Sequence, residues 1–84
     1  MEKTIHTHEY QVLVRLLRKA RQDADVTQVE LAAELGQTQS FISKIELGES
    51  RLDLIQLRAI LTALDISLVD FVVTFERELS REPS

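Results

Sequence analysis

The chain has 84 residues with no cysteine, two glycines and one proline, and its 10 Lys and Arg against 14 Asp and Glu give a formal net charge of −4. A chain of this length forms one domain with a single small core, and the lack of cysteine excludes both a disulfide framework and a thiolate metal site. The apolar content of 44% and the scarcity of Gly and Pro predict an all-α fold in one domain over residues 1–84, and the negative charge argues against indiscriminate binding of nucleic acids or acidic membranes.

Residues 1–8 are interpreted as an N-terminal extension. They lack the apolar core of a secretory signal, and the most apolar stretch of the chain, residues 66–75, is too short to span a bilayer. His6 and His8 have no third ligand nearby in the sequence, so a solvated segment is favoured over a metal site. The sequence therefore predicts a soluble, cytoplasmic protein without a metal.

Apolar residues that recur every three or four positions predict a first helix from about Glu9 to Ala24. Its expected inner face consists of Tyr10, Leu13, Val14, Leu17, Ala20 and Ala24. Beyond this helix, caps rather than periodicity mark where the helices begin.

Thr27 and Glu30 have the spacing of a capping box, which predicts a second helix that ends at Gly36. Thr38 is the expected N-cap of a third helix, which runs to Leu47. The connection between these two helices is so short that it requires a tight corner.

Asp53 is the expected N-cap of a fourth helix, and Ser67 with Asp70 forms a second capping box ahead of a fifth, over residues 67–80. The residues expected to face inward on the fourth helix are Leu54, Leu57, Ile60, Leu61 and Leu64. Five helices joined by short connections predict one compact bundle.

The second and third helices have the residue pattern of a helix-turn-helix. This motif needs a small residue where the helices cross, a left-handed residue in the turn and branched apolar residues on the second helix. Ala32, Gly36 and the pair Ile42 and Ile45 meet these needs in order. An ordinary helical hairpin is the alternative, but several constraints at fixed spacing make it a poor explanation.

Five short runs carry a family resemblance: Thr27–Ala32, Leu35–Gly36, Gln39–Glu46, Gly48–Glu49 and Arg51–Asp53. Together they resemble the Cro/phage-repressor (Xre-type) family of helix-turn-helix transcription regulators, and the resemblance covers most of the chain. It implies a five-helix, lambda-repressor-like domain in which residues 38–47 form a recognition helix that enters the major groove of DNA.

By this resemblance, five side chains of the third helix are expected to read the bases: Thr38, Gln39, Ser40, Ser43 and Lys44. Gln39 is the strongest candidate because its amide can donate and accept at once, which matches N6 and N7 of adenine. A solvated helix face is the alternative for Gln39, Ser40 and Ser43.

Phosphate contacts are expected from residues at the edges of this motif. Gln28 lies in the first turn of the second helix, where free amides favour a phosphate oxygen, and Arg51 is a further candidate with simple solvation as its alternative. Arg21 has two possible roles, a phosphate contact or a buried ion pair with Glu46. The resemblance implies this pair, which would hold the recognition helix against the first helix.

The charge is unevenly distributed along the chain. Residues 1–52 contain seven Lys and Arg and eight Asp and Glu, a net of −1, whereas residues 53–84 contain three and six, a net of −3. Arg15, Arg18, Lys19 and Arg21 cluster on the first helix, so a local positive face is compatible with the acidic total. We expect binding that depends on base contacts and on dimer formation.

The fifth helix has more apolar surface than a small bundle can cover, and surplus apolar surface is typical of an interface. The residues expected to form a two-fold homodimer are Leu68, Val69, Phe71, Val72, Val73 and Phe75. Such a dimer would place two recognition helices about 34 Å apart on a palindromic site. The alternative is a monomer whose other helices bury the whole face.

These features predict a transcriptional regulator, a repressor, that binds a palindromic double-stranded DNA operator as a homodimer. Two alternatives remain: an autoregulatory switch such as a restriction-modification controller or an antitoxin-type regulator, and an adaptor that works through protein contacts. No catalytic arrangement is evident, so neither an enzyme, a cofactor nor a small-molecule ligand is expected. Asp25 and Asp65 depart from the family pattern, in which glycine often ends these helices, and Leu47 and Glu49 replace residues that are often polar or basic.

Overall fold

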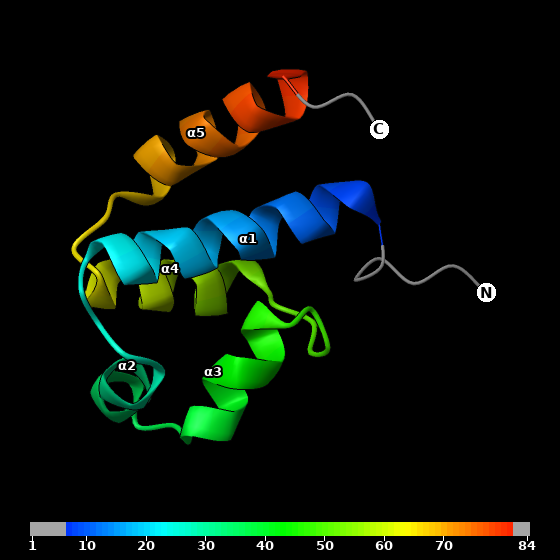
Figure 1. Ribbon diagram of the computed structural model, residues 1–84. Coiled ribbons are helices and arrows are strands. Elements are labelled where there is room, and N and C mark those ends of the chain that lie inside the picture. Colours follow the sequence, from blue (N-terminus) through cyan, green and yellow to red (C-terminus); the bar gives the residue numbers. More distant parts are fainter. Residues whose placement is uncertain (1–6, 82–84) are drawn as a thin grey trace.

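The computed structural model describes residues 7–81, which form five α-helices and, within this range, no strand (Figure 1). The helices are α1 (His8–Asp23), α2 (Gln28–Leu35), α3 (Gln39–Glu46), α4 (Leu54–Ala63) and α5 (Leu68–Arg81). The all-α fold class and all five predicted helices are confirmed. The proposed extension over residues 1–8 is one residue too long because Thr7 caps α1 and His8 is already helical, and His6 lies outside the described residues.

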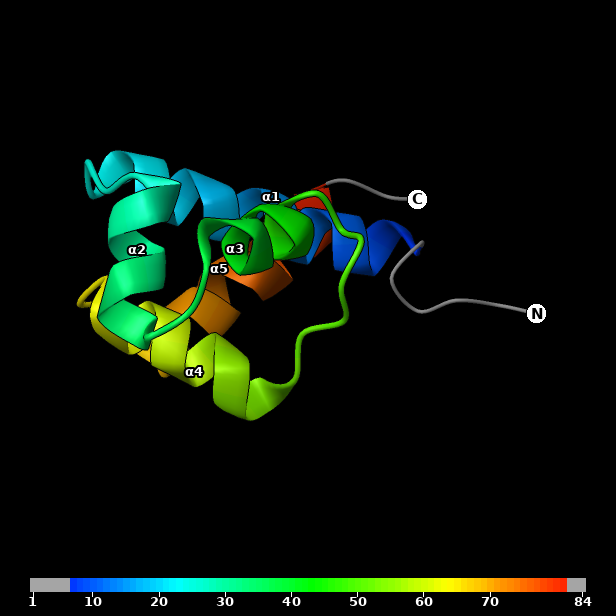
Figure 2. The same cartoon turned by 90° about the horizontal axis from the view of Figure 1, so that it is seen from below.

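In Figure 1, α1 runs through the middle of the molecule, between α5 and the other three helices. It contacts α5 on one side and α3 on the other, while α2 packs against α3 and α4. Seen from below, α3 lies in front with α2 and α4 beside it (Figure 2). The helix-turn-helix and α5 therefore occupy opposite sides of α1.

Local caps explain where the helices begin. Thr27 and Glu30 exchange side chain to backbone hydrogen bonds of 2.9 and 3.0 Å, and Asp53 and Gln56 form a second capping box with bonds of 2.9 and 2.7 Å. Ser67 Oγ accepts a bond of 3.3 Å from the amide of Asp70, which is one of the two bonds of the box predicted there. Because each cap joins residues three positions apart, the sequence alone sufficed to place these starts.

The buried apolar core draws on all five helices and the segment before α4. Its members are Tyr10, Val12, Val14, Leu16, Leu17, Leu31, Ala32, Ile42, Ile45, Leu52, Leu57, Ile60, Leu61, Leu64 and Phe71. Val12 and Leu16 lie outside the single inner stripe predicted for α1, and they are buried because this helix is packed on more than one side.

Two residues predicted to face inward are exposed. Leu54 is 62% exposed because it is the first residue of α4, where the side chain leans toward the N-terminus and past the packed part of the helix. Ala24 is exposed because it is the C-cap of α1, where the chain turns away toward α2.

Tyr10 ties the start of α1 to the connection between α3 and α4. Its hydroxyl donates a hydrogen bond of 3.2 Å to the carbonyl oxygen of Ser50. Burial raises the pKa of the Tyr10 hydroxyl above 10.0, so the neutral form that donates this bond is favoured. The connection that carries Arg51 is thus held close to α1.

Asp25 and Asp65 end α1 and α4 with a backbone φ of 61° each, the left-handed conformation that Gly36 adopts after α2. In both cases two amides donate back into the last helical turn, as when the amide of Ile66 donates to the carbonyl of Leu61 at 2.8 Å. The two departures from the glycine pattern therefore leave the helix ends intact, at the cost of a strained residue in each turn.

Replacing Asp65 by glycine is expected to raise the free energy of unfolding by about 0.5–1 kcal/mol, because glycine adopts this φ without a Cβ clash. Urea unfolding followed by circular dichroism measures the change. Asp23→Gly is the matched control, because Asp23 is helical and glycine there should be destabilising. Equal effects of the two substitutions would contradict this explanation.

Candidate nucleic-acid interface

The α2–turn–α3 unit has the geometry of a helix-turn-helix. Gly36 takes a left-handed φ of 66°, and the amide of Gln37 donates to the carbonyl of Ala32 at 2.8 Å, which closes the end of α2. Thr38 then caps α3 by accepting a bond of 3.1 Å from the amide of Phe41. The two helices meet at a sharp corner, with α3 at the edge of the molecule (Figures 1 and 2).

Arg21 and Glu46 form a buried ion pair that joins α1 to α3. Arg21 Nε donates to Glu46 Oε2 at 2.6 Å, and Arg21 Nη2 donates to Glu46 Oε1 at 3.0 Å. The third guanidinium nitrogen, Nη1, donates to the carbonyl of Val26 at 2.8 Å. The two residues are 7% and 8% exposed, so of the two roles considered for Arg21 the geometry favours the ion pair.

This ion pair continues outward through two glutamines. Gln28 Nε2 donates to Glu46 Oε1 at 2.9 Å, and Gln39 Nε2 donates to Gln28 Oε1 at 2.6 Å. We call Arg21, Glu46, Gln28 and Gln39 the polar chain. It begins in the interior, where Glu46 is buried, and ends on the surface, where Gln39 is exposed.

The polar chain brings together two residues that the sequence analysis had assigned to different roles. Gln28, the expected phosphate ligand, and Gln39, the strongest candidate base reader, are directly hydrogen-bonded. The links from Glu46 to Gln28 and from Gln28 to Gln39 were not predicted from the sequence. They join positions 18 and 11 residues apart and follow from how α2 and α3 cross, which no linear spacing records.

The remaining candidate base readers lie along α3. Gln39, Ser40 and Lys44 are exposed and Ser43 is half-buried, and their spacing places them on one side of the helix. Thr38 is exposed as well, but its hydroxyl is engaged in the cap. Phe41 is half-buried against the core, which agrees with its interpretation as a packing residue.

Two further features border this face. Arg51 is exposed in the connection between α3 and α4. A hollow at the start of α2 is lined by Arg21, Gln22, Asp25, Val26, Thr27, Gln28, Val29 and Gln39. The structure thus brings Gln28 and Gln39 to one hollow beside the N-terminus of a helix.

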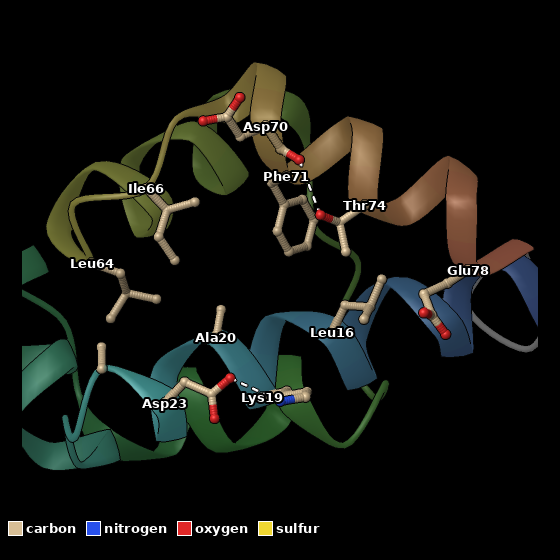
Figure 3. Close-up of a pocket in the computed structure, with 11 residues that line it drawn as sticks. Leu16, Lys19, Ala20, Asp23, Leu64, Ile66, Asp70, Phe71, Thr74 and Glu78 are labelled. Carbon is tan, nitrogen blue, oxygen red and sulfur yellow. Dashed lines mark hydrogen bonds and ion pairs between the residues drawn. The ribbon is translucent and has the colours of Figure 1, made fainter.

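The predicted dimer face of α5 is divided between core and surface. Phe71 is only 5% exposed and belongs to the core, and Leu68 and Phe75 are half-buried against it. Phe71 is therefore not available to a partner, because α5 lies across α1 and uses this side chain to fill the space between them (Figure 3). Val69, Val72 and Val73 remain exposed.

A groove of about 530 Å³ lies between α1 and α5 (Figure 3). Its apolar lining comes from Leu16, Ala20, Ala24, Leu64, Ile66 and Phe71. Asp70 and Glu78 stand at its α5 edge, and the Lys19–Asp23 ion pair, with Nζ and Oδ2 2.8 Å apart, stands at its α1 edge. Because α3 packs on the other side of α1, this groove is separate from the polar chain.

Residues 7–81 contain neither a metal-binding cluster nor a membrane-spanning helix. No group of three or more His, Cys, Asp or Glu side chains is arranged to hold a metal ion. In the same range, no helix has both the length and the apolar character that a membrane span requires.

Comparison with known proteins agrees with this geometry. The helix-turn-helix family model HTH_3 matches residues 17–71. An XRE-family-like protein from Pseudomonas syringae pv. tomato str. DC3000 is 41% identical, with 89% of this chain and 92% of that chain aligned at a TM-score of 0.82. The comparison with curated protein sequences finds no match.

Mutant forms of the restriction-modification controller protein C.Esp1396I are also similar in structure. One is 25% identical, with 87% of this chain and 97% of that chain covered at a TM-score of 0.82. Another is 26% identical, with 98% and 99% covered at a TM-score of 0.81. The likeness extends over nearly the whole length of these proteins.

Proposed function

The chain belongs to the Cro/phage-repressor (Xre-type) helix-turn-helix family, a family of DNA-binding regulators, and from this premise we propose that it is a sequence-specific transcriptional repressor. It binds a palindromic double-stranded DNA operator as a homodimer in the cytoplasm. The direct hydrogen bond between Gln28 and Gln39 is the observation that carries the proposal. It holds Gln28, which is to contact a DNA phosphate, beside Gln39, which is to read a base.

In the proposed complex, α3 enters the major groove with its N-terminal end toward the base edges. Gln39 donates to N7 and accepts from N6 of an adenine. Ser40, Ser43 and Lys44 contact neighbouring bases from the same side of the helix, and Lys44 has the reach for a guanine edge or a phosphate. Thr38 contributes mainly by fixing the start of α3, because its hydroxyl serves as the cap.

Phosphate contacts position α3 in the groove. Gln28 has one amide N–H left after its bond to Glu46, and the first turn of α2 adds backbone amides and the positive end of the helix dipole. Arg51 supplies a second contact from its exposed position. All three guanidinium nitrogens of Arg21 donate within the fold, so we assign Arg21 to the ion pair with Glu46.

The valines of α5 supply the proposed dimer contact. Val69, Val72 and Val73 follow the i, i+3, i+4 spacing, so they form one exposed apolar stripe. A two-fold axis through this stripe pairs identical surfaces and leaves α3 free in each subunit, because α3 and α5 lie on opposite sides of α1 (Figure 1).

Replacing Val73 by glutamate is expected to convert a dimer to a monomer at micromolar concentration, because it places an unpaired charge in an apolar interface. Val73 is 48% exposed in the subunit, so its fold is retained. Sedimentation velocity measures the change. Ile55→Glu is the matched control, because Ile55 is an exposed apolar residue on α4. A monomeric parent chain, or a Val73→Glu variant that stays dimeric, would remove α5 from the interface.

A restriction-modification controller or an antitoxin-type regulator is the second candidate function. The structural likeness to C.Esp1396I over 97–99% of that protein favours the controller. A restriction nuclease gene beside the gene for this chain would support it, whereas a toxin gene would favour the antitoxin-type reading. An adaptor that works through protein contacts would retain its activity when the α3 surface is changed.

The repressor assignment has a direct test in a reporter promoter that carries the DNA site bound by the chain. Expression of the chain is expected to lower transcription from this promoter, because a protein in the major groove blocks the polymerase. Increased transcription would identify an activator, and unchanged transcription would refute regulation through this site.

A further inference from the structure

We propose that Glu46 is a positioning residue for base recognition, whose carboxylate fixes the direction in which the amide of Gln39 faces. The inference rests on the proposed function and deepens it, because it assigns the base preference of Gln39 to a buried residue on the last turn of the same helix. Glu46 acts through Gln28 and touches no base.

Glu46, at the buried end of the polar chain, determines which group of Gln28 faces it. An ionised carboxylate can only accept hydrogen bonds, so the group of Gln28 that faces Glu46 must be its NH₂ group. The amide oxygen of Gln28 then points the other way, toward Gln39. A reversed Gln28 would place two oxygens against each other at the 2.9 Å separation seen here.

The orientation of Gln28 in turn determines the orientation of Gln39. Because the oxygen of Gln28 faces Gln39, Gln39 must donate an N–H to it. Gln39 Nε2 and Gln28 Oε1 are 2.6 Å apart. Gln39 is left with its amide oxygen and its second N–H. These are the acceptor and the donor that adenine requires at N6 and N7, in an order along the groove that can no longer reverse.

Glu46 is well placed to set this order because both of its carboxylate oxygens are bonded to Arg21. It is buried, its two oxygens accept bonds of 2.6 and 3.0 Å from Arg21, and it belongs to the last turn of α3. The polar chain leaves α3 at Glu46, crosses to α2 at Gln28 and returns to the first residue of α3 at Gln39. Both ends of the recognition helix are thereby connected through its neighbour.

The test compares Glu46→Gln with the parent chain on the DNA site bound by the parent. A glutamine at position 46 keeps the size of the side chain but can present either an oxygen or an NH₂ group. It therefore no longer determines which end of the Gln28 amide faces position 46. The base pair read by Gln39 is the one whose discrimination disappears in Gln39→Ala. Binding is measured by fluorescence anisotropy to duplexes that carry each of the four base pairs there, at a temperature where every variant is folded by circular dichroism.

Glu46→Gln is expected to lower discrimination at this base pair about tenfold while discrimination at the other positions is retained. A purely structural role would weaken binding to all duplexes by the same factor and would contradict the inference. Glu49→Gln is the control for the change in charge, because Glu49 is exposed just beyond α3 and has no bond to Gln28 or Gln39 among the hydrogen bonds of residues 7–81.

Gln28→Leu provides an independent arm, because it interrupts the polar chain and leaves the Arg21–Glu46 pair in place. It should weaken binding to all duplexes through the lost phosphate contact and lower discrimination at the Gln39 base pair by the same factor as Glu46→Gln. Gln28→Leu combined with Glu46→Gln should show no further loss of discrimination, since both substitutions interrupt the same series of hydrogen bonds from Glu46 to Gln39. Additive losses would overturn the inference.

Different results would refute the proposed function and the role of Glu46. A parent chain that shows no base preference at any position refutes the proposed function. A parent chain that binds selectively, together with a folded Glu46→Gln variant of unchanged discrimination, refutes only the role of Glu46.

Discussion

Replacing Glu46 by leucine is expected to lower the free energy of unfolding by about 3–5 kcal/mol, because it leaves the Arg21 guanidinium buried without an acid. The Arg21 side chain is only 9% exposed and loses two of its three hydrogen-bond links in this variant. A domain of this size is stabilised by only about 5–15 kcal/mol, so the loss is a large share of the total. Urea unfolding monitored by circular dichroism measures it.

Two controls separate burial from ion pairing as such. Lys19 and Asp23 also pair at 2.8 Å, but both side chains are 64% exposed, so Asp23→Ala should leave stability nearly unchanged. Arg21→Met combined with Glu46→Leu should be more stable than Glu46→Leu alone, because no unpaired charge remains. If Glu46→Leu were as mild as Asp23→Ala, the ion pair would not be what holds α3 against α1.

The second large effect concerns DNA binding. Gln39→Ala combined with Lys44→Ala is expected to weaken operator binding at least 100-fold, because each base contact is worth about 1–3 kcal/mol and a dimer loses it in both half-sites. Both side chains are exposed, so the thermal unfolding of the double variant should match that of the parent. Anisotropy titration at fixed salt measures the affinity.

A comparison variant removes one glutamine and one basic residue from elsewhere on the surface. Gln11 and Arg77 are exposed and belong to α1 and α5, outside α3, so Gln11→Ala combined with Arg77→Ala should keep operator affinity within a few-fold of the parent. If the Gln39 and Lys44 variant instead regulated its target as the parent does, the adaptor alternative would replace the repressor.

Features decided by neighbours in the sequence could be predicted, because a cap joins residues three positions apart. The boxes at Thr27 and Asp53 mark the starts of α2 and α4 for this reason. The left-handed turns at Asp25 and Asp65 were harder to foresee, since aspartate adopts this conformation less readily than glycine.

Features decided by how the helices pack could not be predicted from spacing. Phe71 has the periodicity of an interface residue, yet α5 crosses α1 so that Phe71 enters the core and the neighbouring valines stay outside. The links of Gln28 to Glu46 and Gln39 depend on the crossing of α2 and α3 in the same way. The residues of the candidate site could therefore be predicted from the sequence, but the hydrogen bonds that connect them could not.

Recognition of DNA by α3 is tested by selecting bound duplexes from random DNA with the full chain and sequencing them. We expect an inverted repeat whose half-sites are about 10–10.5 base pairs apart, with a symmetric adenine preference that Gln39→Ala abolishes. No enriched sequence, or an enriched site whose preferences are the same for the parent and Gln39→Ala, would contradict recognition of DNA by α3.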